Sequence, residues 1–159
     1  MAKICRTSSG MRALRFRDTL VRVRMSADDG SDGLSVLEHR AAKGEAPPLH
    51  VHRNEDEVFH VISGKLLFEI DGERMTVSDG DVVLAPRGVP HRFLVQSDAG
   101  AHWLTIMRGR DFESLVRDVS MPTDMSDPPA ISHPGPEEIA ALTAACSANG
   151  IDIVGPPMH

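Results

Sequence analysis

The sequence predicts an all-β domain, a sandwich or jelly-roll barrel, followed by short C-terminal helices. Short valine, isoleucine and leucine runs alternate with polar residues, which is typical of strands with one buried face. The 13 glycines and 11 prolines lie largely between these runs, where they favour turns. Many short strands at close spacing indicate a closed or two-layered fold, because such folds limit the exposed sheet edges.

The first 110 residues divide into a terminus and the predicted barrel. We expect residues 1–10 to be flexible and residues 11–110 to form about eight to ten short strands. Asp71-Gly72, between two alternating segments, predicts a two-residue hairpin turn. A strand over Leu20–Met25 is expected to pair an exposed sheet edge with a second copy, so we expect a homodimer.

Residues 111–159 are expected to form a helical extension that packs on the barrel. Between Asp111 and Val119, four apolar residues recur at i, i+3, i+4 and i+7, which predicts an amphipathic helix. A second helix is predicted over Glu137–Ala148, with a proline at its start and an Asn-Gly stop. Its narrow apolar stripe consists of Ile139, Leu142 and Cys146. We expect this stripe to dock on the barrel, with Cys146 as a small buried core residue.

Charge and composition exclude several classes of protein. The formal net charge of −6 argues against general nucleic-acid binding, which needs a basic surface. No apolar run approaches the roughly 20 residues of a membrane span, and the N-terminus shows no secretion signal. Cys5 and Cys146 do not suggest a disulfide framework. We therefore expect a cytoplasmic protein whose partner is a small molecule, with no nucleic acid and no membrane.

The stretch from Gly44 to Gly64 carries the residues that predict chemistry. His50 and His52 are two residues apart on an extended segment, so their side chains point to the same side. Glu57, from the next strand, can meet both imidazoles at one point. Nitrogen and oxygen donors in this combination suit a divalent first-row metal. The fourth candidate ligand is His91, which begins a strand after a glycine- and proline-rich entry and shares its inward parity with Phe93.

These residues resemble the two signature motifs of the cupin superfamily. The first motif has the form G-x5-H-x-H-x4-E-x6-G and is represented by Gly44, His50, His52, Glu57 and Gly64. The second has the form G-x5-P-x-G-x2-H and is represented by Gly80, Pro86, Gly88 and His91. Val95 stands where the second motif often has asparagine, a position that is not a usual ligand. From about Phe16 to Pro157 the chain looks most like the single-domain, quercetin 2,3-dioxygenase-like cupins.

The resemblance implies a cupin jelly-roll barrel that holds one divalent transition metal. The implied metal ligands are His50, His52, Glu57 and His91. Three imidazoles and one carboxylate accept iron, manganese, nickel, cobalt, copper or zinc, and leave one or two coordination positions open. Glu57 is also the candidate catalytic base when a substrate arrives. The residues expected to form an apolar pocket around the metal are Phe59, Val61, Leu66, Phe68 and Phe93.

Three functions are consistent with this site. The first is a metal-dependent dioxygenase-like enzyme that acts on a small enolic or phenolic compound. The alternatives are a non-redox isomerase or lyase and a non-catalytic ligand-binding protein. Two interpretations of His102 are open, a donor at the pocket or a core or rim histidine. We expect His39 at the surface, and the acidic run Asn54–Glu57 to be solvated apart from Glu57 itself.

Overall fold

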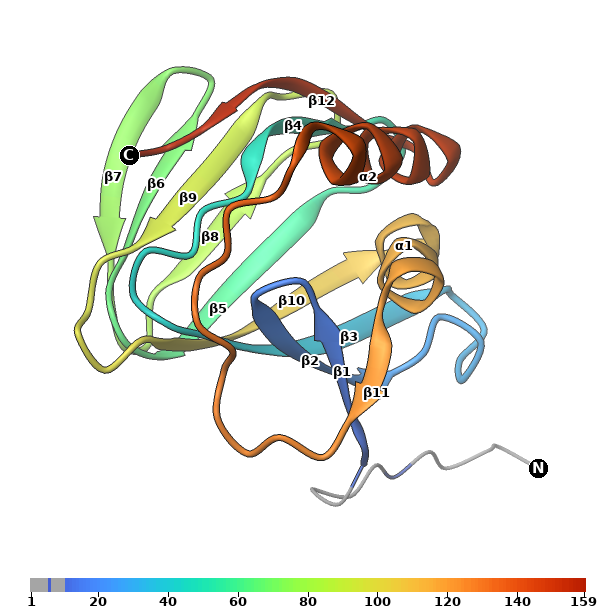
Figure 1. The fold of residues 1–159 in the computed structure, drawn as a ribbon. Coiled ribbons are helices and arrows are strands. Elements are labelled where there is room, and N and C mark those ends of the chain that lie inside the picture. The colour runs from blue at the N-terminus through green and yellow to red at the C-terminus, as the bar shows by residue number, and fades with distance from the viewer. Residues whose placement is uncertain (1–5, 7–10) are drawn as a thin grey trace.

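The computed structural model describes residue 6 and residues 11–159, and it contains two antiparallel sheets that face each other (Figure 1). The larger sheet contains, in spatial order, β11 (Met121–Thr123), β1 (Ala13–Phe16), β2 (Thr19–Met25), β3 (Leu34–Ala41), β10 (Ala101–Arg108), β5 (Glu57–Ser63) and β8 (Val82–Ala85). The smaller sheet contains β12 (Ile151–Pro157), β4 (Pro48–His52), β9 (His91–Val95), β6 (Leu66–Ile70) and β7 (Glu73–Val77). The predicted all-β fold class is confirmed.

The hairpin between β6 and β7 forms at the predicted turn. Asp71 and Gly72 both have positive φ angles, 52° and 80°, as a type I′ turn requires. Ile70 and Glu73 are the flanking partners, so the turn fixes the register of the whole β6–β7 pair.

The strand over Leu20–Met25 differs from its predicted role. It lies within β2, which pairs with β1 on one side and with β3 on the other. Both of its edges are therefore occupied within the chain, and it is not available to extend the sheet of a second copy. The homodimer stays a prediction, without this strand as its support.

The core lies between the sheets and is filled by the inward residues of alternating strands. On β5 the burial pattern alternates, with Glu57, Phe59 and Val61 buried. Trp103 on β10 is 2% exposed and belongs to the same cluster, as expected for a residue that packs between sheets.

The C-terminal extension contains the two predicted helices, α1 (Asp111–Val119) and α2 (Pro136–Ala148), which lie together at one side of the barrel (Figure 1). Cys146 is buried, as predicted, against Leu115 of α1 and Ile151 of β12. Burial also raises the pKa of its thiol to about 11, so it remains an unreactive thiol. Ile139 differs from the prediction, because it is half exposed and does not contribute to the docking stripe.

The extension is not only helical. Its segments β11 and β12 extend the two sheets, and β12 pairs with β4, the strand that carries two of the candidate ligands. Short strands that end in prolines are hard to recognise from pattern alone, since proline is confined to edges and strand ends. The consequence is functional, because β12 covers an edge of β4 and so fixes the position of His50 and His52.

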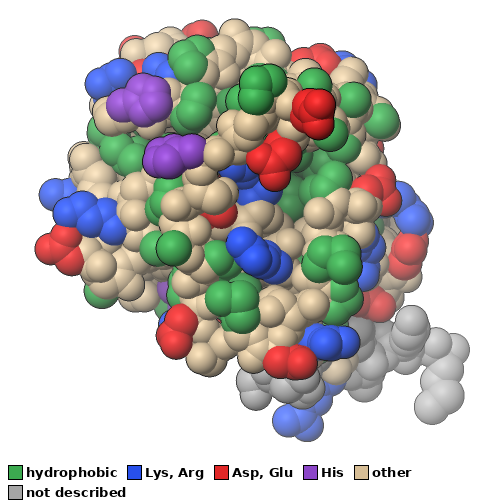
Figure 2. Space-filling view, in the orientation of Figure 1, with side chains coloured by type: hydrophobic (Ala, Val, Ile, Leu, Met, Phe, Trp, Pro, Cys, Tyr) green, Lys and Arg blue, Asp and Glu red, His purple; other side chains and the backbone are tan. Residues whose placement is uncertain are grey.

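The surface carries charges of both signs. On the face shown in Figure 2, acidic and basic side chains are interspersed with apolar ones and are not gathered by sign. Among the described residues, no helix is long and apolar enough to cross a bilayer. The terminus predicted to be flexible, residues 1–10, lies outside the described residues except for Arg6.

Candidate metal centre

Three short strands from both sheets bring the four candidate ligands together. β4 presents His50 and His52, and β9 begins at His91, directly opposite His50 in the register of the smaller sheet. Glu57 comes from the first position of β5 in the larger sheet. The site therefore lies between the sheets, and a bound ion would link the two layers of the barrel.

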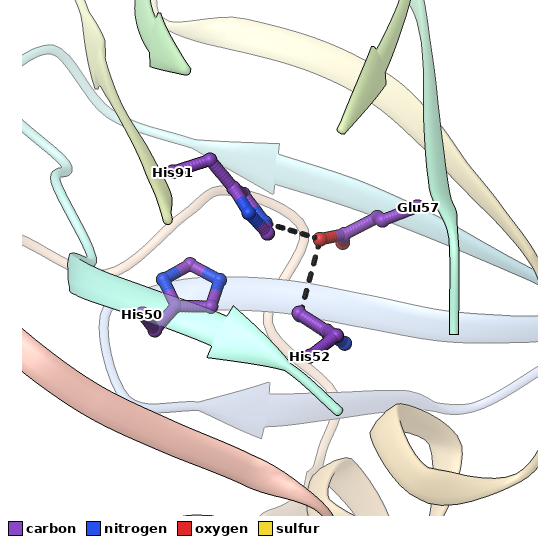
Figure 3. Close-up of side chains that lie close together, drawn as sticks. All are labelled: His50, His52, Glu57 and His91. Atoms are coloured by element: carbon purple, nitrogen blue, oxygen red, sulfur yellow. Dashed lines mark hydrogen bonds and ion pairs between the residues drawn. The ribbon is translucent and has the colours of Figure 1, made fainter. Parts of the chain in front are cut away.

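The ligand atoms of His50, His52, Glu57 and His91 all lie within 4.8 Å of one another. Glu57 Oε2 lies 3.2 Å from Nε2 of His52 and 3.1 Å from Nε2 of His91. Figure 3 shows the carboxylate reaching between these two rings, with the ring of His50 beside them. The sequence-based ligand set thus converges on one point in the structure.

Backbone carbonyls fix the orientation of two of the imidazole rings. Nδ1 of His50 donates to the carbonyl of Pro48 at 2.7 Å, and Nδ1 of His91 donates to the carbonyl of Val89 at 3.0 Å. Each ring then keeps the lone pair of Nε2 for the centre, which is the usual way in which metal-ligating histidines are oriented. Both ring nitrogens of His52 are buried without a hydrogen-bond partner among the described residues. This donor set fits a divalent metal ion.

Burial and mutual contact set the protonation of the cluster. Burial lowers the pKa of His50 to about 3, with the neighbouring His91 and His52 rings acting in the same direction. Burial alone would lower the pKa of His52, but the carboxylates of Glu57 and Glu55 raise it to about 9. Burial likewise opposes ionisation of Glu57, yet its contacts with His52 and His91 hold its pKa well below the usual range. The cluster therefore contains a buried carboxylate among three rings, and a cation stabilises this arrangement.

Glu55 is buried behind His52 and has a structural role that the sequence pattern does not indicate. It is 2% exposed, although the acidic run to which it belongs was expected to be solvated. Its carboxylate accepts hydrogen bonds from the backbone N–H groups of Asp111, at 2.8 Å, and Phe112, at 3.1 Å, at the start of α1. Its Oε2 also lies 3.7 Å from Nδ1 of His52. Glu55 thus connects the metal cluster to α1.

Gly109 makes room for this carboxylate. A Cβ at position 109 would overlap Glu55, and the φ angle of 150° is one that other residues rarely adopt. The chain just after β10 passes so close to the Glu55 side chain that only glycine fits at position 109.

A cavity of about 70 Å³ adjoins the cluster and is reached by His50 and Glu57. Of the predicted pocket residues, Phe59 and Phe93 line it. Val61, Leu66 and Phe68 do not line it; they are fully buried in the core, where the Phe68 ring packs against Phe59 and Phe93 with centroid distances of 4.8 and 5.6 Å. These three inward side chains therefore pack into the core and do not enclose the cavity.

His102 does not reach the cavity. It points to the opposite face of β10 from Trp103, and its Nε2 lies 3.0 Å from a carboxylate oxygen of Glu38. Strand alternation explains this, since Trp103 and Thr105 take the inward positions on β10. The pocket role of His102 is therefore corrected to that of a partly buried residue on the outer face, hydrogen-bonded to Glu38.

Sequence reasoning missed His39, which was expected at the surface. It is 3% exposed, lines the cavity, and its Nε2 lies 2.9 Å from Oγ1 of Thr105. Its ring is sandwiched between Trp103, 5.2 Å away and nearly parallel, and Phe112 of α1, 5.9 Å away. The alternation of β3 was the available signal, because His39 shares its parity with the buried Leu37. Burial lowers the pKa of His39 to about 4.

Glu45 was also missed, since nothing in its sequence neighbourhood marks it as inward. Its side chain lines the cavity. Burial raises the pKa of its carboxyl to about 7, and Asp18 raises it further while Arg17 opposes the shift. Glu45 is thus a second carboxyl that faces the same space as Glu57, and unlike Glu57 it titrates near neutral pH.

Comparison with known sequences agrees with the geometry. A family model described as the cupin domain matches residues 37–107. A quercetin 2,3-dioxygenase of Bacillus subtilis is 30% identical over 154 residues, which cover 97% of this chain and 44% of that protein. An oxidoreductase of Arthrobotrys oligospora is 36% identical over 49% of this chain and 35% of that protein. The chain spans less than half the length of these curated relatives.

Solved structures share the fold. A predicted oxalate decarboxylase of Thermotoga maritima aligns with a TM-score of 0.61 at 17% identity, covering 66% of this chain and 98% of that one. A protein of Photorhabdus luminescens aligns with a TM-score of 0.55 at 20% identity, covering 70% of this chain and 91% of that one. At such identities the likeness concerns the architecture alone.

Proposed function

Because the chain is a member of the cupin superfamily, with one cupin domain at its centre, we propose that it is a metal-dependent dioxygenase acting on a small enolic or phenolic compound. The observation that carries the proposal is the convergence of three imidazoles and one carboxylate within 4.8 Å, beside a cavity lined by aromatic rings. The similarity to a quercetin 2,3-dioxygenase over most of this chain supports oxygen chemistry.

Each of the four residues has a role in this proposal. His50, His52, Glu57 and His91 would hold one divalent transition metal. When bound, such a metal supplies a Lewis acid that favours the enolate or phenolate form of a substrate and its oxidation by O2. Glu57 is ionised at neutral pH and is placed to accept the hydroxyl proton of the substrate. Both atoms of O2 enter the product and the enolate supplies the electrons, so no external reductant is needed.

Oxygen uptake tests the proposal. The protein is loaded separately with Fe(II), Mn(II), Ni(II) or Co(II), and O2 consumption is followed with an electrode across enolic diketones, catechols and flavonols. We expect uptake with at least one metal and substrate pair, and none with the His91→Ala variant treated in the same way. No uptake above that of the variant, across the whole panel, would rule the dioxygenase out.

A second candidate function is a non-redox isomerase or lyase, and Glu45 favours it. A carboxyl with a pKa near 7 is suited to donate and accept protons at neutral pH, and it lines the same cavity as Glu57. Under strict exclusion of O2 this enzyme would still turn over, whereas the dioxygenase would not. Saturable binding without turnover in either atmosphere would instead indicate a ligand-binding protein.

A further inference from the structure

The cavity has a second wall that contains almost all of the aromatic residues of the chain. Four of the five phenylalanines and the only tryptophan line it. These residues are Phe16, Phe59, Phe93, Trp103 and Phe112. These rings also belong to the hydrophobic core or pack against it, and a cavity wall of this composition suits a ligand with apolar surface.

The volume of the cavity limits that ligand. About 70 Å³ is less than half the volume of an apolar cavity of roughly 150 Å³ that takes up benzene. Pockets for drug-sized molecules occupy about 300–1,000 Å³. A flavonol, with three rings, exceeds this space several-fold, whereas an acyclic diketone or a single ring exceeds it least and extends only partly from the mouth of the cavity.

The aromatic wall is held in place from behind, so it does not open by simple side-chain rotation. His39 is stacked between Trp103 and Phe112, and Phe93 meets Trp103 edge-on at 5.3 Å. The backbone of Phe112 is in turn bound to the buried carboxylate of Glu55. Widening the cavity would separate stacked rings and leave buried hydrogen-bonding groups without partners, which costs about 1–3 kcal/mol for each group.

The same wall carries donors for an oxygen atom. Nε1 of Trp103 is buried and has no acceptor among the described residues. The pair formed by His39 Nε2 and Thr105 Oγ1, 2.9 Å apart, lies beside it on the cavity. Burying an indole N–H without an acceptor is unfavourable, so a ligand oxygen that reached this group would stabilise it.

We propose that this site binds a compact oxygen-bearing compound of one ring or less, such as a 1,3-diketone enolate or a catechol, and that it excludes flavonols. The ligand lies between the metal cluster and Trp103, and its size is limited by the stacked rings of Trp103, His39 and Phe112. This inference rests on the proposed function for the class of compound. Its test measures ligand binding and does not depend on turnover.

Trp103 provides the readout, because it is the only tryptophan and it lines the cavity. Protein loaded with Zn(II), which has no redox chemistry, is titrated with acetylacetone, catechol and quercetin while tryptophan fluorescence is followed. Absorption by the ligands is corrected with free N-acetyltryptophanamide. We expect a saturable change with acetylacetone or catechol, at an affinity at least about tenfold, or 1.4 kcal/mol, above that for quercetin.

Two variants separate the effect of the cavity size from the effect of the Trp103 N–H donor. Phe16→Ala, at the edge of the cavity, is expected to raise the affinity for quercetin at least about fivefold without changing the metal content. Trp103→Phe, followed by calorimetry, is expected to weaken catechol binding about fivefold, while His102→Gln on the outer face of the same strand leaves it unchanged. If a variant fails to fold, the titration of the unaltered protein still decides the question of size.

The outcomes distinguish this inference from the proposed function. Quercetin binding as tight as that of catechol, or no saturable binding of any compound of this size, would overturn the inference. Turnover of quercetin by the unaltered protein would overturn it while leaving the dioxygenase intact. Binding of catechol or acetylacetone without O2 uptake by any metal form would support the inference and remove the dioxygenase.

Discussion

The cavity has two walls that are held by different forces. On the metal wall, short strands of both sheets present His50, His52, Glu57 and His91, and backbone carbonyls orient two of the rings. The opposite wall consists of rings that stack on one another, centred on Trp103 and closed by α1 through Phe112. One wall depends on directed polar contacts and the other on packing.

This difference indicates a division of labour. The metal wall determines whether an ion binds, since each ligand contributes directly to its affinity. The aromatic wall determines which molecule can lie beside that ion, because its rings set the free volume. Glu55 contacts His52 of the metal wall and the backbone of Phe112 of the aromatic wall, so it links the two walls.

The largest effect is expected from the metal wall. His52→Ala and His91→Ala each remove one of four ligands, so metal affinity should fall by about 100-fold or more, which is about 3 kcal/mol. Metal content after dialysis, measured by mass spectrometry, should fall from about one ion per chain towards none. His60→Ala, on the outward face of the strand that carries Glu57, is the matched control and should keep its metal. Equal metal content in all of these proteins would show that the cluster is not a metal site.

The metal wall could be predicted from the sequence, whereas only Phe59 and Phe93 of the aromatic wall were predicted. The ligand residues stand at fixed spacings within two short motifs, so strand parity alone brings them to one side. His39, Phe112 and Glu45 come from three separate segments that meet only through the sheet order and the docking of α1. Single-sequence patterns specify the face of a strand on which a residue lies, but they do not specify which strands are neighbours.

The same limit explains the errors within the predicted pocket. Val61, Leu66 and Phe68 lie on the inward faces of their strands, as predicted, yet they pack within the core and do not line the cavity. Parity does not tell how far along the barrel axis a residue lies. The helix over Asp111–Val119 was recognisable because four apolar residues lie on one face. β12 was not, because its pairing with β4 joins residues about 100 positions apart.

The next effect concerns the link between the walls. Glu55→Ala removes the acceptor for two backbone N–H groups of α1, so the free energy of unfolding should fall by about 1–3 kcal/mol. Denaturant unfolding of the metal-free protein measures this change. Glu73→Ala, which removes an exposed glutamate from β7, is the control and should change stability by less than about 0.5 kcal/mol. A Glu55→Ala protein as stable as the control would show that α1 is held by packing alone.

The smallest effect is the pH dependence of the free energy of unfolding that arises from His39 in the aromatic wall. The pKa of His39 is about 4 in the folded protein and about 6.5 in an unfolded chain, so below pH 6.5 only the unfolded chain binds the proton. The free energy of unfolding must therefore fall as the pH decreases from 6.5 to 5, by up to about 1.4 kcal/mol per pH unit. His50, whose pKa is about 3, adds a slope of the same sign and size. Glu45 opposes both, because its carboxyl, with a pKa of about 7, binds a proton in the folded chain at a pH where the unfolded chain does not. His52 acts at higher pH, because its raised pKa stabilises the fold below pH 6.5 and loses that contribution as the pH rises towards 9.

His39→Phe isolates the contribution of the aromatic wall to this slope. The substitution keeps a ring between Trp103 and Phe112 but removes the titrating nitrogen. The slope between pH 6.5 and 5 should therefore nearly vanish in the metal-free protein, because the remaining contributions of His50 and Glu45 oppose each other. Phe93→Leu disturbs the same wall without removing a titrating group, and it should shift stability at every pH while leaving the slope unchanged. Urea unfolding at several pH values measures both. A His39→Phe protein with an unchanged slope would mean that His39 keeps its proton on folding, and that the aromatic wall carries a positive charge towards Glu57.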